Sequence, residues 1–242
     1  MTEVDTTPEI TRQVKSQLDS MVVGIELTLI SIIQGIALGG LATSAVPPLI
    51  NWQMEYWPYI VLGLLAILIF WSRSLIHTLS FIAWPLEFGH NFIYFVSTLV
   101  EVALFTQLTT PENWFALSVV YFGFALLLYW YDLRMVYRHG ADFQTPAERK
   151  LLQDIIGDQR INVRLWMPAS IAFHLVSWWL IHTYPDQFVE QRWHVGLALM
   201  AVAIGAYYLW EGVHILRRRQ HWIVARYVEE RRESLDPGEE TA

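Results

Sequence analysis

The stretch STLVEVALFTQLTTPENW, from Ser97 to Trp114, contains the pattern that recurs through this chain. An apolar run ends in a short polar segment with a proline, and a second apolar run begins directly after it. Proline suits the first turn of a helix because an N–H group has no helical partner there. The stretch therefore predicts the end of one apolar helix, a short loop and the start of the next. One residue does not fit the run, because Glu101 lies among apolar residues with no basic residue nearby.

The composition of the 242-residue chain is typical of a membrane protein. Charged residues make up 16% of the chain, whereas they make up about a quarter of an average soluble domain. The apolar residues fall in blocks of roughly 18 to 25, the length that crosses a hydrocarbon layer of about 30 Å. We therefore predict an all-α, polytopic membrane protein. The chain has no cysteine, which excludes disulfides and thiolate metal sites.

Six apolar blocks stand between polar segments. The predicted spans are Met21–Ala42, Tyr59–Phe81, Asn91–Leu108, Trp114–Tyr131, Met167–Tyr184 and Val195–Leu216. Of the 16 Lys and Arg residues, only Arg192 falls in a loop on the side opposite to the N-terminus. Because cytoplasmic segments carry the excess of Lys and Arg, we predict a multi-pass plasma-membrane protein with both termini in the cytoplasm.

The basic residues also indicate the partners of the protein. They stand in short sets beside the predicted spans, a pattern that suits the anionic headgroups of a lipid bilayer. Nothing in the sequence indicates nucleic-acid binding. We also expect association with a second copy of the chain or with another membrane protein.

The spans and their connections divide the chain into five regions. These are a cytoplasmic amphipathic segment (1–20), spans 1 to 4 (21–138), a cytoplasmic loop (139–165), spans 5 and 6 (166–216) and a basic, then acidic, tail (217–242). Within the loop, TPAERKLLQDIIG predicts a short helix that Thr145 and Glu148 cap and Gly157 ends. Its leucines and isoleucines form one stripe, so we expect this helix to lie on the membrane surface or against a partner.

The six spans group into three helical hairpins with similar ends. Each first helix ends before a loop with a proline, and each second helix ends in aromatic residues and a charge: FWSR (70–73), YWYD (129–132) and YYLWE (207–211). This similarity predicts a threefold repeat about an axis along the membrane normal, with an axial path as one consequence. The alternative is that tryptophans and terminal charges are common at the ends of all membrane helices.

Three polar residues share a predicted depth near the bilayer centre. Gln34, Glu101 and His174 each lie ten to thirteen residues before the proline of the following loop. A carboxylate that faces lipid costs several kcal/mol, so Glu101 should face the protein interior, be protonated or be paired. Such a cluster suits cation binding, proton relay or hydrogen bonding to a polar substrate. The structural alternative is a buried hydrogen bond that joins two helices.

A second polar layer is predicted nearer the cytoplasmic face. Its members are Glu26, Arg73, His77, Glu87, His90, Asp132, Glu211 and His214. Glu26 lies too deep in the first span to reach water, and we predict Arg73 as its ion-pair partner. Glu211 and His214 lie three residues apart on one helical face, so they are candidate metal ligands together with His77 or His90.

The histidines of the predicted spans are also candidate ligands for haem. A bis-histidine haem site would need a second histidine at the depth of His174, and the other span histidines lie at shallower positions. We therefore predict no cofactor.

Three functions from different classes fit these features. The first is a channel or permease for an ion or small polar solute, with Gln34, Glu101 and His174 along its path. The second is a non-catalytic subunit that binds protein partners or lipid. The third is a redox or metal-dependent membrane enzyme that uses the inner histidines and carboxylates. No catalytic motif such as GxSxG or a Walker sequence is present. We therefore assign no catalytic residue and favour transport because of Glu101.

Overall fold

The computed structural model describes residues 7–80, 88–140 and 145–235. All regular structure in these ranges is helical. In chain order the elements are α1 (Thr7–Ile50), the 3-10 turn η1 (Met54–Tyr56), α2 (Trp57–Ser80), α3 (Phe88–Phe105), α4 (Pro111–His139), α5 (Pro146–Ile161), the π-helical turn η3 (Asn162–Trp166), α6 (Met167–Thr183), the π-helical turn η4 (Asp186–Glu190) and α7 (His194–Leu235).

Four segments of the described ranges are long and apolar enough to cross a membrane. They are Met21–Ile50, Met54–Thr78, Pro111–Arg138 and His194–His221. The apolar part of α3 is shorter, Gly89–Phe105, and α6 has 17 residues. The prediction of an all-α protein with several membrane-spanning helices is confirmed at this level.

The first and last helices extend beyond their predicted ends. Helix α1 begins at Thr7, so the predicted N-terminal segment is continuous with the first span, and it ends at Ile50 after Pro47 and Pro48. A proline in a helix loses its N–H bond and its ring crowds the carbonyl group four residues earlier. Both prolines lie in the last turn of α1, so only the end of the helix bears this cost. Helix α7 likewise continues past the predicted span to Leu235, where arginine and glutamate residues favour helix.

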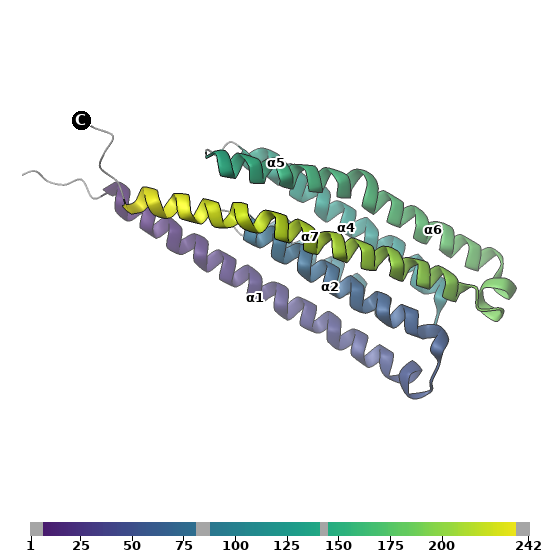
Figure 1. The fold of residues 1–242 in the computed structure, drawn as a ribbon. Coiled ribbons are helices and arrows are strands. Elements are labelled where there is room, and N and C mark those ends of the chain that lie inside the picture. Colours follow the sequence, from purple (N-terminus) through teal and green to yellow (C-terminus); the bar gives the residue numbers. More distant parts are fainter. Residues whose placement is uncertain (1–6, 81–87, 141–144, 236–242) are drawn as a thin grey trace, which may run out of the picture.

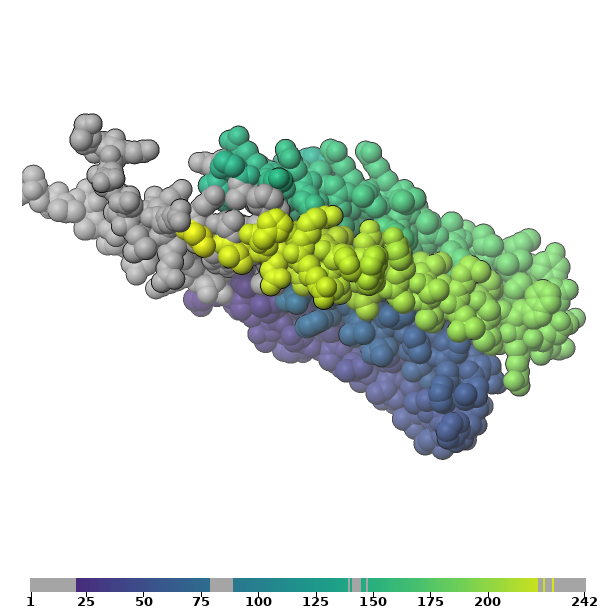
Figure 2. All heavy atoms as spheres, viewed as in Figure 1, coloured from purple at the N-terminus to yellow at the C-terminus, as the bar shows by residue number. Residues whose placement is uncertain are grey.

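The two ends of the bundle are formed by different elements. The start of α1, helix α5 and the end of α7 lie together at one end, which we call the α5 end; η1 and η4 lie at the opposite end (Figure 1). On the face drawn in Figure 2, α7 lies between α5 and α6 on one side and α1 and α2 on the other.

The order in which the helices pack differs from that of a threefold repeat. Helix α7 packs against α2, α2 against α1, α1 against α3, α3 against α4 and α4 against α6, whereas the consecutive helices α6 and α7 make little contact. A threefold axis would place the second helix of each hairpin against the first helix of the next. Here α1 meets α3 and α2 meets α7 instead, so the hairpins are not equivalent.

Among the described residues, the largest apolar core lies toward the η1 end, where it joins α1, α2, α3, α4, α6 and α7. Tyr59, Phe105 and Phe115 are fully buried there, and Tyr59 contacts the edge of Trp114 at 5.4 Å between ring centroids. Gly63 permits this close packing, because a Cβ atom there would lie 2.6 Å from a methyl carbon of Leu41. This end of the bundle is therefore closed by large, tightly packed side chains.

Helix α5 packs against the bundle of its own chain, whereas the sequence predicted that it lies on the membrane surface or against a partner. Its apolar stripe packs against α4, where Leu151 and Ile155 are buried among Met135 and Val136. The predicted capping box is confirmed, because the Glu148 N–H donates to Thr145 Oγ1 and the Thr145 N–H donates to the Glu148 carboxylate.

The predicted stop of this helix at Gly157 is wrong. The helix continues to Ile161 and then through η3 into α6 without a loop. Glycine weakens a helix interior by only about 1 kcal/mol, and the buried contacts of α5 on both sides of Gly157 exceed this cost.

Candidate functional site

A cavity of about 330 Å³ lies inside the bundle. Residues of α1 to α7 all contribute to its wall, and on α2 they extend from Leu62 to Thr78. At about 1.5 Å per residue, this stretch of helix is roughly 24 Å long. The wall is apolar over most of this length, and charged side chains gather at the α5 end. The cavity is therefore a long apolar space with one polar end.

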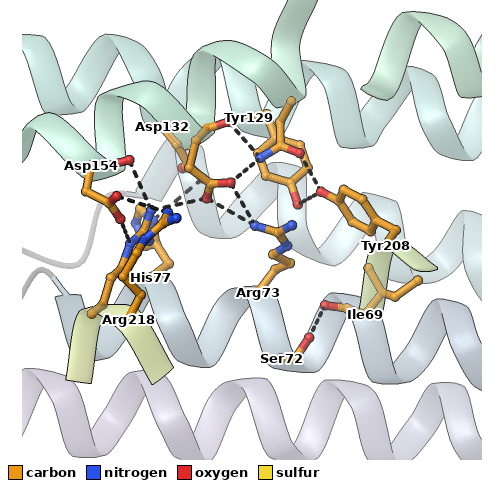
Figure 3. A network of polar contacts seen from close by, with 12 residues as sticks. Ile69, Ser72, Arg73, His77, Tyr129, Asp132, Asp154, Tyr208 and Arg218 are labelled. Carbon is orange, nitrogen blue, oxygen red and sulfur yellow. Dashed lines mark hydrogen bonds and ion pairs between the residues drawn. The ribbon is translucent and has the colours of Figure 1, made fainter. Parts of the chain in front are cut away.

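We call the part of the cavity near α5 the polar end, because ionisable residues line it. They are Glu26, Arg73, His77, His90, Asp132, Asp158 and Arg219. Side chains from α2, α4, α5 and α7 point toward one another in this region (Figure 3). Five of the seven belong to the inner layer predicted from sequence, whereas Asp158 and Arg219 were not among the candidates.

Arg73 is held by Asp158 of α5. One guanidinium nitrogen of Arg73 donates to both carboxylate oxygens of Asp158, at 3.0 and 3.1 Å. The guanidinium also lies over the ring of Tyr208, 4.5 Å from its centroid, an arrangement that favours a cation. Among the described residues no ion pair joins Arg73 to Glu26, so the predicted pairing is wrong. The physical reason is that α5 docks against the bundle and brings the carboxylate of Asp158, which lies outside the predicted spans, to Arg73.

Arg219 completes this network from α7. It donates to Asp154 at 2.8 Å and to Asp158 at 3.3 Å, although its side chain is only 3% exposed. Asp154 also pairs with Arg218 at 3.0 Å. Three arginines of α2 and α7 thus bind two aspartates of α5, and each buried charge has a partner.

A chain of hydroxyl and amide groups continues the network into the apolar part of the cavity. The Tyr208 hydroxyl donates to Asn162 at 2.6 Å and lies 2.9 Å from the Tyr129 hydroxyl. Asn162 is fully buried at the start of η3 and its amide donates to Asp158. Single π-helical turns are frequent at functional sites. Here the turn places Asn162 beside Asp158, which lines the cavity.

Two histidines and an aspartate form a second cluster at the polar end. His90 Nε2 lies 3.2 Å from one carboxylate oxygen of Asp132, and His77 Nδ1 lies 3.8 Å from the other. The two imidazole rings stack at 5.7 Å with an angle of 13° between their planes. The three residues come from α2, α3 and α4. Their potential metal-binding atoms all lie within 4.8 Å of one another.

The other predicted inner-layer residues lie elsewhere. His214 is exposed, and its ring bonds to the Trp210 carbonyl at 3.0 Å, so it does not join His77 and His90. Glu211 does not line the cavity, although one of its carboxylate oxygens is buried without a hydrogen-bond partner in the described part of the chain. Glu87 lies outside the described residues. The predicted metal set of Glu211 and His214 with an inner histidine is therefore not formed.

Gln34 and Glu101 lie together between α1 and α3, as their shared depth suggested. Glu101 is 0% exposed and faces the Gln34 side chain. The Gln34 amide donates to the Tyr94 hydroxyl at 3.4 Å. Neither carboxyl oxygen of Glu101 has a hydrogen-bond partner among the residues that the structure describes.

His174 lies apart from this pair, on α6. Its Nδ1 bonds to the Ser170 carbonyl at 2.8 Å, and its ring packs among Phe115, Phe122 and Phe173. His174 lines the cavity, whereas Gln34 and Glu101 lie behind its wall. The single cluster of three residues expected from sequence is thus a buried pair and a separate histidine.

Comparisons with protein-family models, with curated proteins and with solved structures found no match. A function for this chain is therefore argued from the cavity and its residues.

Arg73→Met and Asp158→Leu should each destabilise the protein. Asp158→Leu leaves the buried Arg73 without a carboxylate, and Arg73→Met leaves Asp158 with Arg219 as its remaining cation. Breaking a buried ion pair typically costs about 3–5 kcal/mol, and the contact with Arg219 should place Arg73→Met at the lower end of this range. We expect the double variant to lose much less than the sum of the two, because it removes both charges. The measurement is thermal unfolding of the detergent-purified protein in a double-mutant cycle.

The matched control combines Arg73→Met with Glu26→Gln. These two effects should add, because the side chains do not pair. Coupling in the control cycle and additivity in the Asp158 cycle would contradict the observed pairing.

Proposed function

We propose that this chain is a plasma-membrane protein with six spans that binds an amphipathic molecule of the bilayer inside the helical bundle. The apolar chain of the molecule lies along the cavity, and its hydrogen-bonding head group lies at the polar end. The observation that carries the proposal is the cavity itself, with apolar walls over most of its length and converging polar groups at one end.

The topology rests on helix length and on charge. Helices α3 and α6 have 18 and 17 residues, within the range of about 17–25 that spans a bilayer. Of the 16 Lys and Arg residues, only Arg192 belongs to the connections at the η1 end. By the positive-inside rule, the α5 end faces the cytoplasm and both termini are cytoplasmic.

Reporter fusions test this topology. Fusions after residues 51, 109 and 188 should report an outside location, and fusions after residues 143 and 238 an inside location. The reason is that six spans with both termini inside place the connections at the η1 end outside. An inside report at residue 109 would remove α3 from the set of spans and contradict the proposal.

The size and wall of the cavity favour an amphipathic ligand over an ion. Ligand sites in proteins are mostly apolar pockets of about 300–1,000 Å³ with a few convergent polar groups. A path for an ion or a small polar solute, as favoured from sequence, would need polar groups or water along its whole length. Here Leu62, Leu104 and Trp114 line the part toward the η1 end, and the largest apolar core closes the bundle beyond them.

The polar end suits a head group without a large net charge. Arg73 and Arg219 are already paired with Asp154 and Asp158, so a strongly anionic head group would have to compete with these carboxylates. The hydroxyl groups of Tyr129 and Tyr208 offer hydrogen bonds close to the network. The Tyr208 hydroxyl donates to Asn162 and the Tyr129 hydroxyl to Tyr208, so the Tyr129 oxygen is left to accept a bond, and a head group with a hydroxyl donor matches it.

A lateral entry from the bilayer fits the packing of the helices. Consecutive helices α6 and α7 make little contact with each other, yet Phe173 and His174 of α6 and Ala201 and Gly205 of α7 all line the cavity. A ligand that enters between these two helices reaches the cavity without passing through the closed η1 end.

Ala201→Phe should empty the cavity of its ligand. Ala201 is 5% exposed and lines the cavity, so a phenyl ring there occupies the volume of the ligand. We expect mass spectrometry of organic extracts to find about one amphipathic molecule per wild-type protein, and at least about tenfold less in the variant, which corresponds to about 1.4 kcal/mol.

Ala203→Phe is the matched control, because Ala203 lies two residues further on α7 and is exposed. It should retain the wild-type amount of ligand. Wild-type protein without a bound amphiphile, or equal retention in both variants at equal thermal stability, would refute the proposal.

Glu101 supports a second candidate function, proton- or cation-coupled transport. A fully buried carboxyl group without a counter-ion is stable in a membrane only as the neutral acid or with a bound cation. Its neighbour Gln34 contacts Tyr94, which lines the cavity. Transport by this route makes Glu101 the residue that gains and loses the proton or cation.

Glu101→Gln separates this candidate from a structural role. Glutamine keeps the shape and hydrogen-bonding capacity of the side chain but cannot ionise. If Glu101 carries protons, the variant should fold normally and lose potential-driven acidification of liposomes that contain a pH-sensitive dye. Equal proton flux in wild type and variant, or none in either, would leave Glu101 a structural residue. Glu101→Leu should then lower the melting temperature because it removes the polar group that the buried Gln34 side chain faces, which leaves only the Tyr94 hydroxyl beside Gln34.

A further inference from the structure

We infer that His77, His90 and Asp132 form a binding site for a divalent first-row transition metal, of the zinc or iron(II) class, at the polar end of the cavity. Three different helices supply these residues, and they are 13 and 42 residues apart in the sequence. The fold thus brings together three side chains that have no local reason to meet. The inference goes beyond the ligand proposed above and does not depend on it.

The geometry is close to that of a metal site. Ligand atoms bound to zinc at about 2.0–2.2 Å lie roughly 3–4 Å from one another. His90 Nε2 and His77 Nδ1 lie 3.2 and 3.8 Å from oxygens of Asp132, and all three ligand atoms fall within 4.8 Å.

The chemistry of the three groups is selective. Imidazole nitrogen and carboxylate oxygen together suit zinc, iron, nickel and copper, whereas calcium and magnesium prefer oxygen ligands alone. Two histidines and one carboxylate leave at least one coordination position open. That position faces the cavity, because all three residues line it.

The charges around the cluster favour a cation. Asp132 is 6% exposed, and Glu26 of α1 also lines the cavity and interacts with His90. The buried arginines of this end are engaged by the aspartates of α5, as described above, and do not contact Asp132 in the described structure. Two carboxylates, of which Asp132 is buried and Glu26 half-buried, therefore face two half-buried histidines. The nearby Arg219 is paired with Asp154 and Asp158, so a divalent cation would balance the charge of the two carboxylates.

The alternative is a metal-free ion pair in which a protonated histidine holds Asp132. Both arrangements use the same contacts, but only the first predicts a stoichiometric, saturable metal. The test uses full-length, tag-free protein in detergent that has been treated with a chelator and dialysed.

Titration with Co²⁺ measures metal binding directly, because Co²⁺ that is coordinated by histidine and carboxylate gives a visible absorption band. Wild-type protein should bind one equivalent of Co²⁺, and Zn²⁺ should displace it. His77→Gln and His90→Gln should each weaken binding by at least about tenfold, since even residues outside the ligand set cost 10–100-fold when changed. His214→Gln, at the exposed histidine of α7, should bind as wild type does.

Two further measurements keep the outcome decisive. The melting temperature in chelator shows whether each variant is folded, and zinc should raise the melting temperature of wild type and of His214→Gln only. If the His77 and His90 variants do not fold, the zinc-edge X-ray absorption spectrum of wild type must show two imidazole ligands. No Co²⁺ band in wild type, equal affinity in the folded variants, or a spectrum without imidazole ligands would overturn the inference. Loss of the amphipathic ligand proposed above would not overturn the metal site.

Discussion

The charge network between Arg73, Asp158 and Arg219 holds the α5 end of this bundle together. Arg73 belongs to a membrane-spanning helix, Asp158 to the helix of the long connection and Arg219 to the last helix. An unpaired guanidinium in this position would cost several kcal/mol, so α5 has to remain docked while Arg73 is buried. The apolar stripe of α5 contributes the rest of the attachment through Leu151 and Ile155. Electrostatics and apolar packing thus act on the same short helix.

This docking also determines the shape of the cavity. Ile155, Asp158 and Gln159 of α5 line its polar end, where they separate the cavity from the surface of the bundle. The opposite end is closed by aromatic packing around Tyr59 and Phe115. The core at the η1 end also includes Ile181 of α6 and Ala198 of α7. The gap between α6 and α7, whose mutual contact is slight, therefore lies between the two closures. The cavity is therefore bounded firmly at both ends and weakly on one side, which is the arrangement expected for exchange with the bilayer.

The class of the protein could be predicted from the sequence because apolar blocks of bilayer length need no partner to be recognised. Individual site residues were predicted for a similar reason: Asp132, His77 and His90 are polar groups near the ends of apolar runs. Their grouping was not predictable, since it depends on α3 packing between α1 and α4 and on the absence of threefold symmetry. The expected threefold order relied on similar helix ends, which reflect the membrane interface and not the packing partners.

The partner of Arg73 was missed for a different physical reason. A short amphipathic helix between two spans is typical of the membrane surface or of a contact with a partner, and neither position brings its acidic residues to an arginine of a span. A signal was present: Asp154 and Asp158 are spaced four apart, as are Leu151 and Ile155, so the charged and apolar stripes run side by side along one helix. An amphipathic helix whose apolar edge borders a pair of like charges fits against a bundle that offers both an apolar groove and buried arginines.

Glu101 and Asp132, the buried acidic residues in the described part of the chain, differ in their position relative to the cavity. Asp132 lines the cavity together with His77 and His90, so a molecule or ion bound at the polar end would contact it directly. Glu101 lies behind the wall, and Gln34 connects it to the hydroxyl of Tyr94, which lines the cavity. A proton gained or lost at Glu101 would change which bonds the Gln34 amide can make, and hence the orientation of the Tyr94 hydroxyl. Two side chains, Gln34 and Tyr94, thus lie between Glu101 and the cavity, so a change in the charge of Glu101 acts on the cavity wall through these two polar groups.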